Sequence, residues 1–169
     1  MSRSPWNSIQ QAFSESFPAE GERFAPTLIT GMTESELENH RKQFPHGLPE
    51  EIALLLENTR GFDVMSLGEI RFDNAPDRDA QIKLCEDEEE NTWHVKMDTQ
   101  SGAWKEVLVR SGSGDMELEQ APNLTSFLEQ IFHQAGHEVS WLEHTRKELR
   151  RLSQKPAKPS FWKRLFPFL

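Results

Sequence analysis

The sequence predicts an α+β fold with N-terminal helices, a mainly antiparallel twisted sheet of about five or six strands, and a C-terminal helix packed on that sheet. Two changes in hydrophobic period predict this order. Apolar residues recur at helical spacing up to Gly61, and beyond it they alternate with polar residues as in strands. Helical spacing then returns after Asn123.

Two helices are predicted before residue 46. The first begins with Ser4 as its N-cap and Pro5 at the first helical position. The second opens at "MTESEL", where Thr33 and Glu36 form a capping box, and Pro45 ends it. Each helix therefore has a start signal of its own in the sequence.

A third helix is predicted in "GLPEEIALLLENTRGF", residues 47–62. Pro49 fits its first turn, and Gly61 supplies the left-handed residue that stops it. Phe62 can then fold back on Leu56, a contact that often accompanies such a cap. We expect this helix to be part of the scaffold.

The strands are predicted from alternating apolar and polar residues. Trp93, Val95 and Met97 share one face, and "TQSG" supplies a turn with Gly102, so residues 92–109 are predicted to form a hairpin. The predicted strands are 67–72, 80–86, 92–98, 103–109 and 116–120.

The closing helix is predicted to be capped by Asn123. Gly136 interrupts its pattern, so one long helix and two shorter helices are both open alternatives. A single angular stripe contains Leu124, Leu128, Ile131, Ala135, Val139, Leu142, Arg146 and Leu149.

Three segments in this order resemble the SUKH superfamily, which contains fungal cell-wall-synthesis regulators of the Smi–Knr type and many bacterial immunity proteins. They are "TESELENHRKQFPHGLPEEIALLLENTRGF", "WHVKMDTQSGAWKEVLV" and "APNLTSFLEQIF", and the resemblance covers roughly residues 30–135. In that superfamily an asparagine commonly stands beside the helix-stopping glycine. Here Asn58 stands three residues before Gly61.

The resemblance implies a SUKH-like α+β domain over residues 31–153, preceded by a helical extension at 1–30 and followed by a tail at 154–169. The resemblance also implies a non-catalytic protein-binding module. The favoured function is that of an immunity protein that binds and neutralises a cationic partner toxin. The alternative is an intracellular regulator or adaptor of cell-envelope synthesis, docked at the inner membrane face by its tail. No cofactor is expected.

The composition indicates one soluble domain in the cytoplasm. The chain has 169 residues, and no apolar run approaches the roughly 18 residues that span a bilayer. Its N-terminus lacks the apolar core of a signal peptide, and Cys85 is the only cysteine. A peripheral location at the inner membrane face is the alternative that the tail suggests.

Charge is distributed unevenly along the chain. Residues 1–145 contain 27 acidic residues and 11 Lys or Arg, whereas residues 146–169 contain one acidic residue and eight Lys or Arg. The acidic body argues against binding to nucleic acid phosphates. It favours a cationic partner, or serves solubility alone.

The densest acidic run lies between two predicted strands and contains Glu86, Asp87, Glu88, Glu89 and Glu90. One interpretation is a solvated loop tip kept extended by repulsion. The other is an acidic prong for the cationic site of a partner. A calcium loop is disfavoured because the run lacks alternate spacing and a glycine.

The C-terminal tail combines basic and aromatic side chains, which suits the interface of an anionic membrane. Two alternatives are that the aromatic side chains of the tail pack back on the domain, or that the tail docks in a groove of a partner protein. The residues of the tail that carry these predictions are Phe161, Trp162, Lys163, Arg164, Leu165 and Phe166.

No residue pattern predicts an enzyme or a metal site. His133, His137 and His144 fall on the helix face opposite the apolar stripe, so we expect them to face water. The acidic neighbours of Cys85 raise its pKa, which argues against a nucleophile and favours a small apolar side chain in a sheet.

Overall fold

Helices and antiparallel strands share the chain, and the predicted α+β class is confirmed. The computed structural model describes residues 5–14, 17–19, 22–24, 28–45, 47–64, 68–98, 100, 103–134 and 140–153. The elements within these residues are α1 (Pro5–Ser14), β1 (Phe17–Ala19), β2 (Glu22–Phe24), β3 (Leu28–Thr30), α2 (Glu34–Arg41), α3 (Glu50–Asn58), β4 (Thr59–Val64), β5 (Gly68–Arg71), β6 (Gln81–Glu86), β7 (Thr92–Met97), β8 (Trp104–Arg110), β9 (Glu117–Ala121), α4 (Leu124–Gln134) and α5 (Ser140–Ser153).

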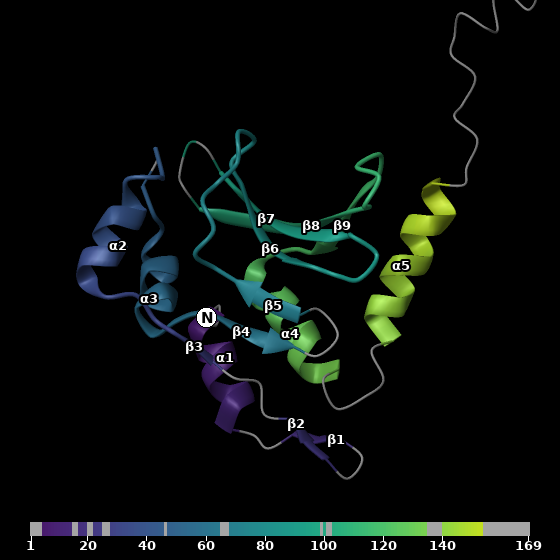
Figure 1. Ribbon diagram of the computed structural model, residues 1–169, viewed down its shortest axis with the longest axis horizontal. Helices are drawn as coiled ribbons and strands as arrows, with labels where there is room; N and C mark the ends of the chain where they lie inside the picture. Colours follow the sequence, from purple (N-terminus) through teal and green to yellow (C-terminus); the bar gives the residue numbers. More distant parts are fainter. Residues whose placement is uncertain are drawn as a thin grey trace, which may run out of the picture.

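The strands form separate sheets, where the sequence predicts one. A β1–β2 hairpin is followed by a three-stranded sheet in the order β3–β4–β5 and a four-stranded sheet in the order β6–β7–β8–β9 (Figure 1). The hairpin predicted at residues 92–109 is confirmed as β7 and β8. Trp93 pairs with Val109 and Val95 with Val107, and all four side chains are fully buried.

One hydrophobic core joins helices to the inner faces of both larger sheets. Fully buried side chains reach it from α1 (Ile9), β4 (Phe62) and α4 (Phe127). The ring of Phe62 lies 5.2 Å from that of Phe132 in α4, measured between centroids. Because Ile9 is in this core and β3 pairs with β4, residues of the predicted 1–30 extension pack with the domain that follows.

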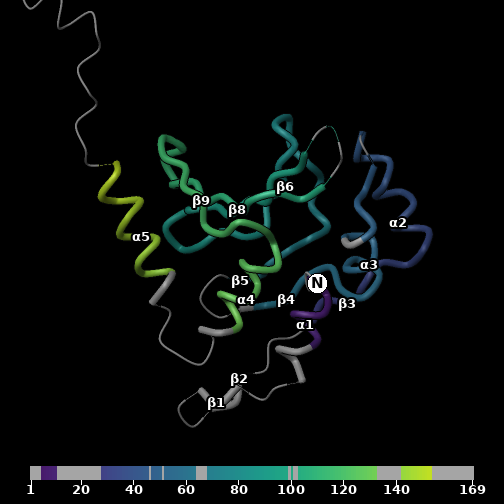
Figure 2. The backbone as a smooth tube through the Cα atoms, turned by 180° about the vertical axis from the view of Figure 1, so that it is seen from behind, coloured from purple at the N-terminus to yellow at the C-terminus, as the bar shows by residue number. Residues whose placement is uncertain are grey.

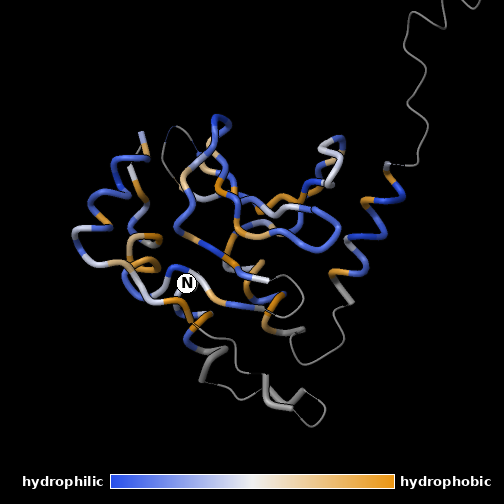
Figure 3. Tube along the Cα trace, in the orientation of Figure 1, coloured by the Kyte–Doolittle hydropathy of each residue, from blue (hydrophilic) through white to orange (hydrophobic). Residues whose placement is uncertain are grey.

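The helices lie at different sides of the sheets. α2 and α3 stand at one side of the molecule, and α5 stands at the other, beyond β9 (Figures 1 and 2). Apolar segments occur along α3, α4 and the strands, whereas α5 alternates between apolar and polar residues (Figure 3). Of the two alternatives for the closing helix, the structure has two helices, α4 and α5.

Local capping signals in the sequence are confirmed where the structure describes them. The Thr33 backbone N–H donates to Glu36 Oε2 at 2.8 Å, and the Glu36 backbone N–H donates to Thr33 Oγ1 at 3.4 Å. The Asn123 side chain accepts from the Ser126 backbone N–H at 2.8 Å and caps α4. α2 ends at Arg41, before the predicted stop.

Gly61 is not a helix stop, contrary to the prediction. α3 ends at Asn58, and Gly61 is the third residue of β4, paired with both β3 and β5. A Cβ at Gly61 would lie 1.9 Å from the Ile70 carbonyl oxygen, and its φ is +153°. Glycine is therefore required by the close approach of the neighbouring strand.

Gly61→Ala is expected to destabilise the fold by about 3 kcal/mol, because the methyl group overlaps β5 and the backbone is strained. Gly47→Ala is the matched control: φ is +85° there and no atom lies within 4 Å of the added Cβ. It should cost only about 1–2 kcal/mol, from strain alone. Urea denaturation measures the free energy of unfolding of both variants. Equal losses of stability would contradict a steric clash between a Gly61 side chain and β5.

Glu36 is expected to make stability depend on pH in acid. Its pKa falls from 4.5 to about 2, first through the Thr33 backbone hydrogen bond and then through Arg60. Because the folded pKa is the lower one, this stabilisation is complete above about 4.5 and is lost as pH falls toward about 2. In Glu36→Gln the amide oxygen can still accept the Thr33 N–H, but the side chain does not titrate. Between pH 4.5 and about 2 the free energy of unfolding, measured by urea denaturation, should therefore fall less for this variant than for the wild type.

Candidate functional site

The acidic run forms the turn between β6 and β7. The Asp87 N–H donates to the Asn91 carbonyl at 3.0 Å, and the Glu90 N–H donates to the Asp87 carbonyl at 3.0 Å. Glu90 takes a left-handed conformation with φ of 63°. The run is therefore a tight hydrogen-bonded turn and not a chain extended by repulsion.

Asp87 lies at the centre of this turn, and its side chain is fully buried. Its Oδ1 accepts from the backbone N–H groups of Glu89 and Asn91, both at 2.9 Å. Its Oδ2 accepts from Asn91 Nδ2 at 3.1 Å and from Arg146 Nε at 2.8 Å. Asp87 therefore cannot belong to an exposed acidic prong, because its oxygens are occupied inside the protein.

Arg146 comes from α5, 59 residues further along the chain. Burial lowers its pKa, but the hydrogen bond and the charge of Asp87, followed by the charge of Glu89, outweigh burial and raise the pKa above its ordinary value. One helical turn later, Arg150 Nε donates to Glu89 Oε2 at 3.3 Å. The acidic turn thus binds two arginines on one flank of α5, an arrangement that we call the arginine clamp.

Other described contacts also hold α5 against β9 and the core. Thr145 Oγ1 donates to Gln120 Oε1 of β9 at 2.9 Å, and Gln120 Nε2 donates to Gln130 Oε1 of α4 at 3.1 Å. Leu142 and Leu149 are each 3% exposed and join the core. The predicted stripe of α5 is therefore buried as expected, and Arg146 lies on it because Asp87 neutralises its charge.

The remaining acids of the run differ in what they contact. Glu86 pairs with Lys83, whereas Glu88 and Glu90 are exposed and make no ion pair within the described residues. The β8–β9 turn lies against them: a Cβ at Gly112 would be 2.8 Å from the Glu89 carbonyl oxygen and 3.0 Å from the Glu90 Cβ. The two turns therefore form one surface.

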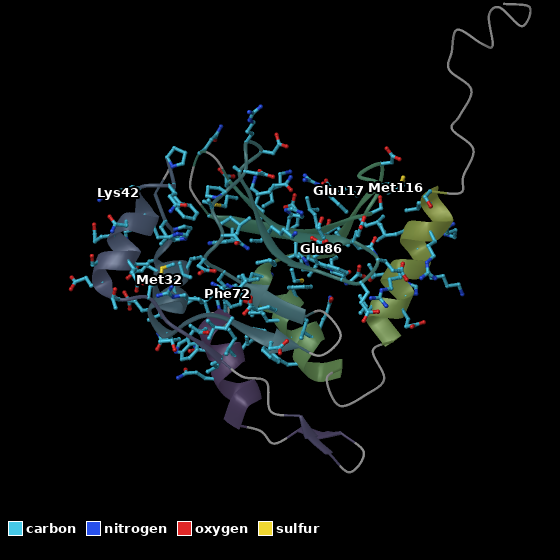
Figure 4. The ribbon with its side chains drawn as sticks, viewed as in Figure 1. Met32, Lys42, Phe72, Glu86, Met116 and Glu117 are labelled. Carbon is cyan, nitrogen blue, oxygen red and sulfur yellow. The ribbon has the colours of Figure 1, made fainter. Side chains whose placement is uncertain are left out.

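A third exposed carboxylate, Asp115, comes from the β8–β9 turn and also has no ion pair in the described part of the chain. We call Glu88, Glu90 and Asp115 the acidic end of the four-stranded sheet. Figure 4 shows Glu86 at the end of β6, and Met116 and Glu117 where β9 begins. Glu117 is excluded from the acidic end because Arg110 binds it at 2.7 Å.

The outer face of the four-stranded sheet is polar and mostly self-paired. Arg110 donates to Glu117 and, at 2.7 Å, to Gln81 Oε1, and Lys96 pairs with Glu106. His94 lies on this face, where burial and then Arg110 lower its pKa. Its Nε2 shares a hydrogen bond with Thr92 Oγ1 at 3.0 Å, and we assign no chemistry to it.

The described residues contain no group of three or more side chains that could hold a metal ion. His144 is exposed, whereas the His133 side chain and His137 lie outside the described residues. Cys85 is buried, and burial, followed by the charge of Asp87, raises its pKa. The prediction of a small apolar side chain in a sheet is confirmed, because Cys85 is buried in β6.

One pocket, of about 330 Å³, opens where the first turns of α1, α3 and α4 meet β8. Its walls include Pro49, Ile52, Trp104 and Leu124, and none of the described side chains that line it is ionisable. A smaller pocket of about 130 Å³ lies beside Phe44 and Met97. Among the described residues, the walls of the larger pocket supply no general acid or base.

The predicted tail residues Phe161, Trp162, Lys163, Arg164, Leu165 and Phe166 lie outside the described residues. Among the helices that are described, none combines the length and the apolar character needed to cross a membrane. Comparison with known protein families, with curated proteins and with solved structures finds no match.

Loss of Arg146, the less exposed arginine of the arginine clamp, is expected to lower the free energy of unfolding substantially. Arg146→Met leaves the carboxylate of Asp87 buried without its cation, so we expect a loss of about 3 kcal/mol. Arg150→Met is the matched control, because its partner Glu89 is one-third exposed, and it should cost under about 1 kcal/mol. Urea denaturation measures the free energy of unfolding of both variants. Equal losses of stability would show that the buried Asp87 does not depend on Arg146.

Proposed function

We propose that the protein is a non-catalytic protein-binding module, and specifically an immunity protein that binds and neutralises a cationic partner toxin. The acidic end carries this proposal. Glu88, Glu90 and Asp115 are exposed on two abutting turns, and none has an ion pair within the described residues. Their charges are available to a basic surface, where complementarity accelerates association and excludes wrong partners.

The buried Asp87 supports this proposal indirectly. It fixes the backbone of the turn on which Glu88 and Glu90 stand, through hydrogen bonds to Glu89 and Asn91. A turn that is ordered before binding loses less conformational entropy when the partner arrives. The acidic end is therefore suited to rapid recognition without rearrangement.

The proposal includes SUKH membership, which the resemblance of residues 30–135 supports, and a cytoplasmic location, which the single buried cysteine favours. It involves no cofactor and no reaction. Nucleic acid is disfavoured as a partner, because the exposed carboxylates of the acidic end would repel phosphates.

A second candidate function is a regulator or adaptor of cell-envelope synthesis at the inner membrane face. One observation favours it: α5 is strongly amphipathic, and it leads directly into the basic aromatic tail. Such helices lie at anionic membrane surfaces with their apolar side buried.

Neutralising the acidic end should strongly weaken capture of a basic protein. The tagged full chain is compared with a triple variant, Glu88→Gln, Glu90→Gln and Asp115→Asn, in pull-downs from the source cell at low and high salt. A basic protein retained by the wild type should be reduced at least about tenfold by the triple variant, and by high salt, because both remove charge attraction.

The matched control is a second triple variant, Glu34→Gln, Glu57→Gln and Glu129→Gln, which removes three exposed carboxylates from α2, α3 and α4. It should bind as the wild type does. Equal loss in both variants would mean that only net charge matters, and no loss in either would exclude the acidic end as the binding surface.

A further inference from the structure

We propose that α5 is a releasable membrane-binding helix. The acidic turn holds it on the domain, and an anionic lipid surface competes with that turn for its arginines. This inference rests on the second candidate function, a role at a membrane surface, and assigns that role to a described element in addition to the tail.

The sequence of α5 has the features of a helix that lies on a membrane. Leu142 and Leu149 are buried on one side, and Leu152 is half-buried beside them. The same 14 residues contain four basic side chains, Arg146, Lys147, Arg150 and Arg151. A large apolar moment with low net hydrophobicity and basic flanks is typical of interfacial helices, and Figure 3 shows the alternation along α5.

Docking on the domain uses the groups that a membrane would use. Arg146 and Arg150 bind the carboxylates of Asp87 and Glu89, and the two leucines face the core. Headgroup phosphates are oxyanions that arginine binds in the same way as carboxylates. The lipid surface can therefore replace the acidic turn, while the acyl boundary replaces the apolar contacts.

In the docked helix most groups that would bind a membrane are already engaged within the protein. Its exposed basic residues are Lys147, Arg150 and Arg151, but Glu89 binds Arg150 and Glu148 binds Arg151 at 2.8 Å. Release frees Arg146 and Arg150 from their carboxylates and uncovers the leucines. Because only the released state presents these groups, an anionic surface must shift the equilibrium toward release.

The peripheral position of α5 makes this exchange possible. The helix stands beyond β9, at the side of the molecule away from α2 and α3 (Figures 1 and 2). The interactions described for it include the arginine clamp, the Thr145–Gln120 hydrogen bond and two buried leucines. None of the described strand pairings involves α5, so its release breaks no sheet hydrogen bond among them.

The first test measures the position of α5 directly. Spin labels are placed at Ser113→Cys and Ser153→Cys, both exposed, in the full chain; the buried Cys85 should stay unlabelled. With phosphatidylcholine vesicles the distance between labels should stay short and narrowly distributed. With phosphatidylglycerol–phosphatidylcholine vesicles a second, longer distance should appear.

The second test loosens the clamp from the side of the domain. Glu89→Gln weakens the hold on Arg150 without changing α5, so binding to anionic vesicles should strengthen about two- to five-fold, the range expected for one exposed ion pair. Glu90→Gln removes the same charge from the same turn without touching the clamp. It should bind as the wild type does.

Each result is decisive. If the wild type does not bind anionic vesicles, both the membrane role and the release of α5 are excluded. If it binds with an unchanged label distance, the tail alone binds lipid and only the release of α5 is excluded. If Glu89→Gln and Glu90→Gln bind equally, the acidic turn does not compete with lipid.

Discussion

The carboxylate of Asp87 is buried, and it binds both the β6–β7 turn and α5. A buried charge without partners is strongly unfavourable, so its oxygens must be satisfied locally and by a cation. The turn supplies three donors, and α5 supplies Arg146. The β6–β7 turn and the last described helix are therefore positioned together, although many residues separate them.

This dependence connects the two surfaces that could act on partners. Glu88 and Glu90 face solvent because Asp87 faces inward, and α5 stays on the domain because its arginines reach the same turn. Any change that moves α5 also leaves Asp87 and Glu89 without their cations, in the same turn that carries Glu88 and Glu90 of the acidic end. Protein binding and membrane binding would be coupled through this turn.

The sequence predicted those features that depend on neighbouring residues. The Thr33–Glu36 capping box, the Asn123 cap, the β7–β8 hairpin and the buried stripe of α4 are each encoded within a few positions. Gly61 was misassigned because a glycine after an apolar helix is expected equally at a helix cap and in a closely packed strand. Only the position of Ile70 in β5 distinguishes them. The division into two larger sheets also depends on such distant pairing.

The arginine clamp illustrates the same limit. Asp87 followed four residues later by Asn91 is a local signal for a side-chain-supported turn, and Arg146 on an apolar stripe requires a buried acid. Each of these two signals can be recognised in the sequence by itself. Choosing Asp87 from among 28 acidic residues requires the tertiary structure.

The strand next to α5 has a bearing on aggregation. β9 is the last strand of the four-stranded sheet, so its outer edge has no strand partner within the described residues, and exposed edges recruit strands from other molecules. β9 is only five residues long, and it carries Glu117 and Glu119 at alternate positions. Short length and like charges oppose pairing with a second copy, so the sheet edge stays protected even where α5 does not cover it.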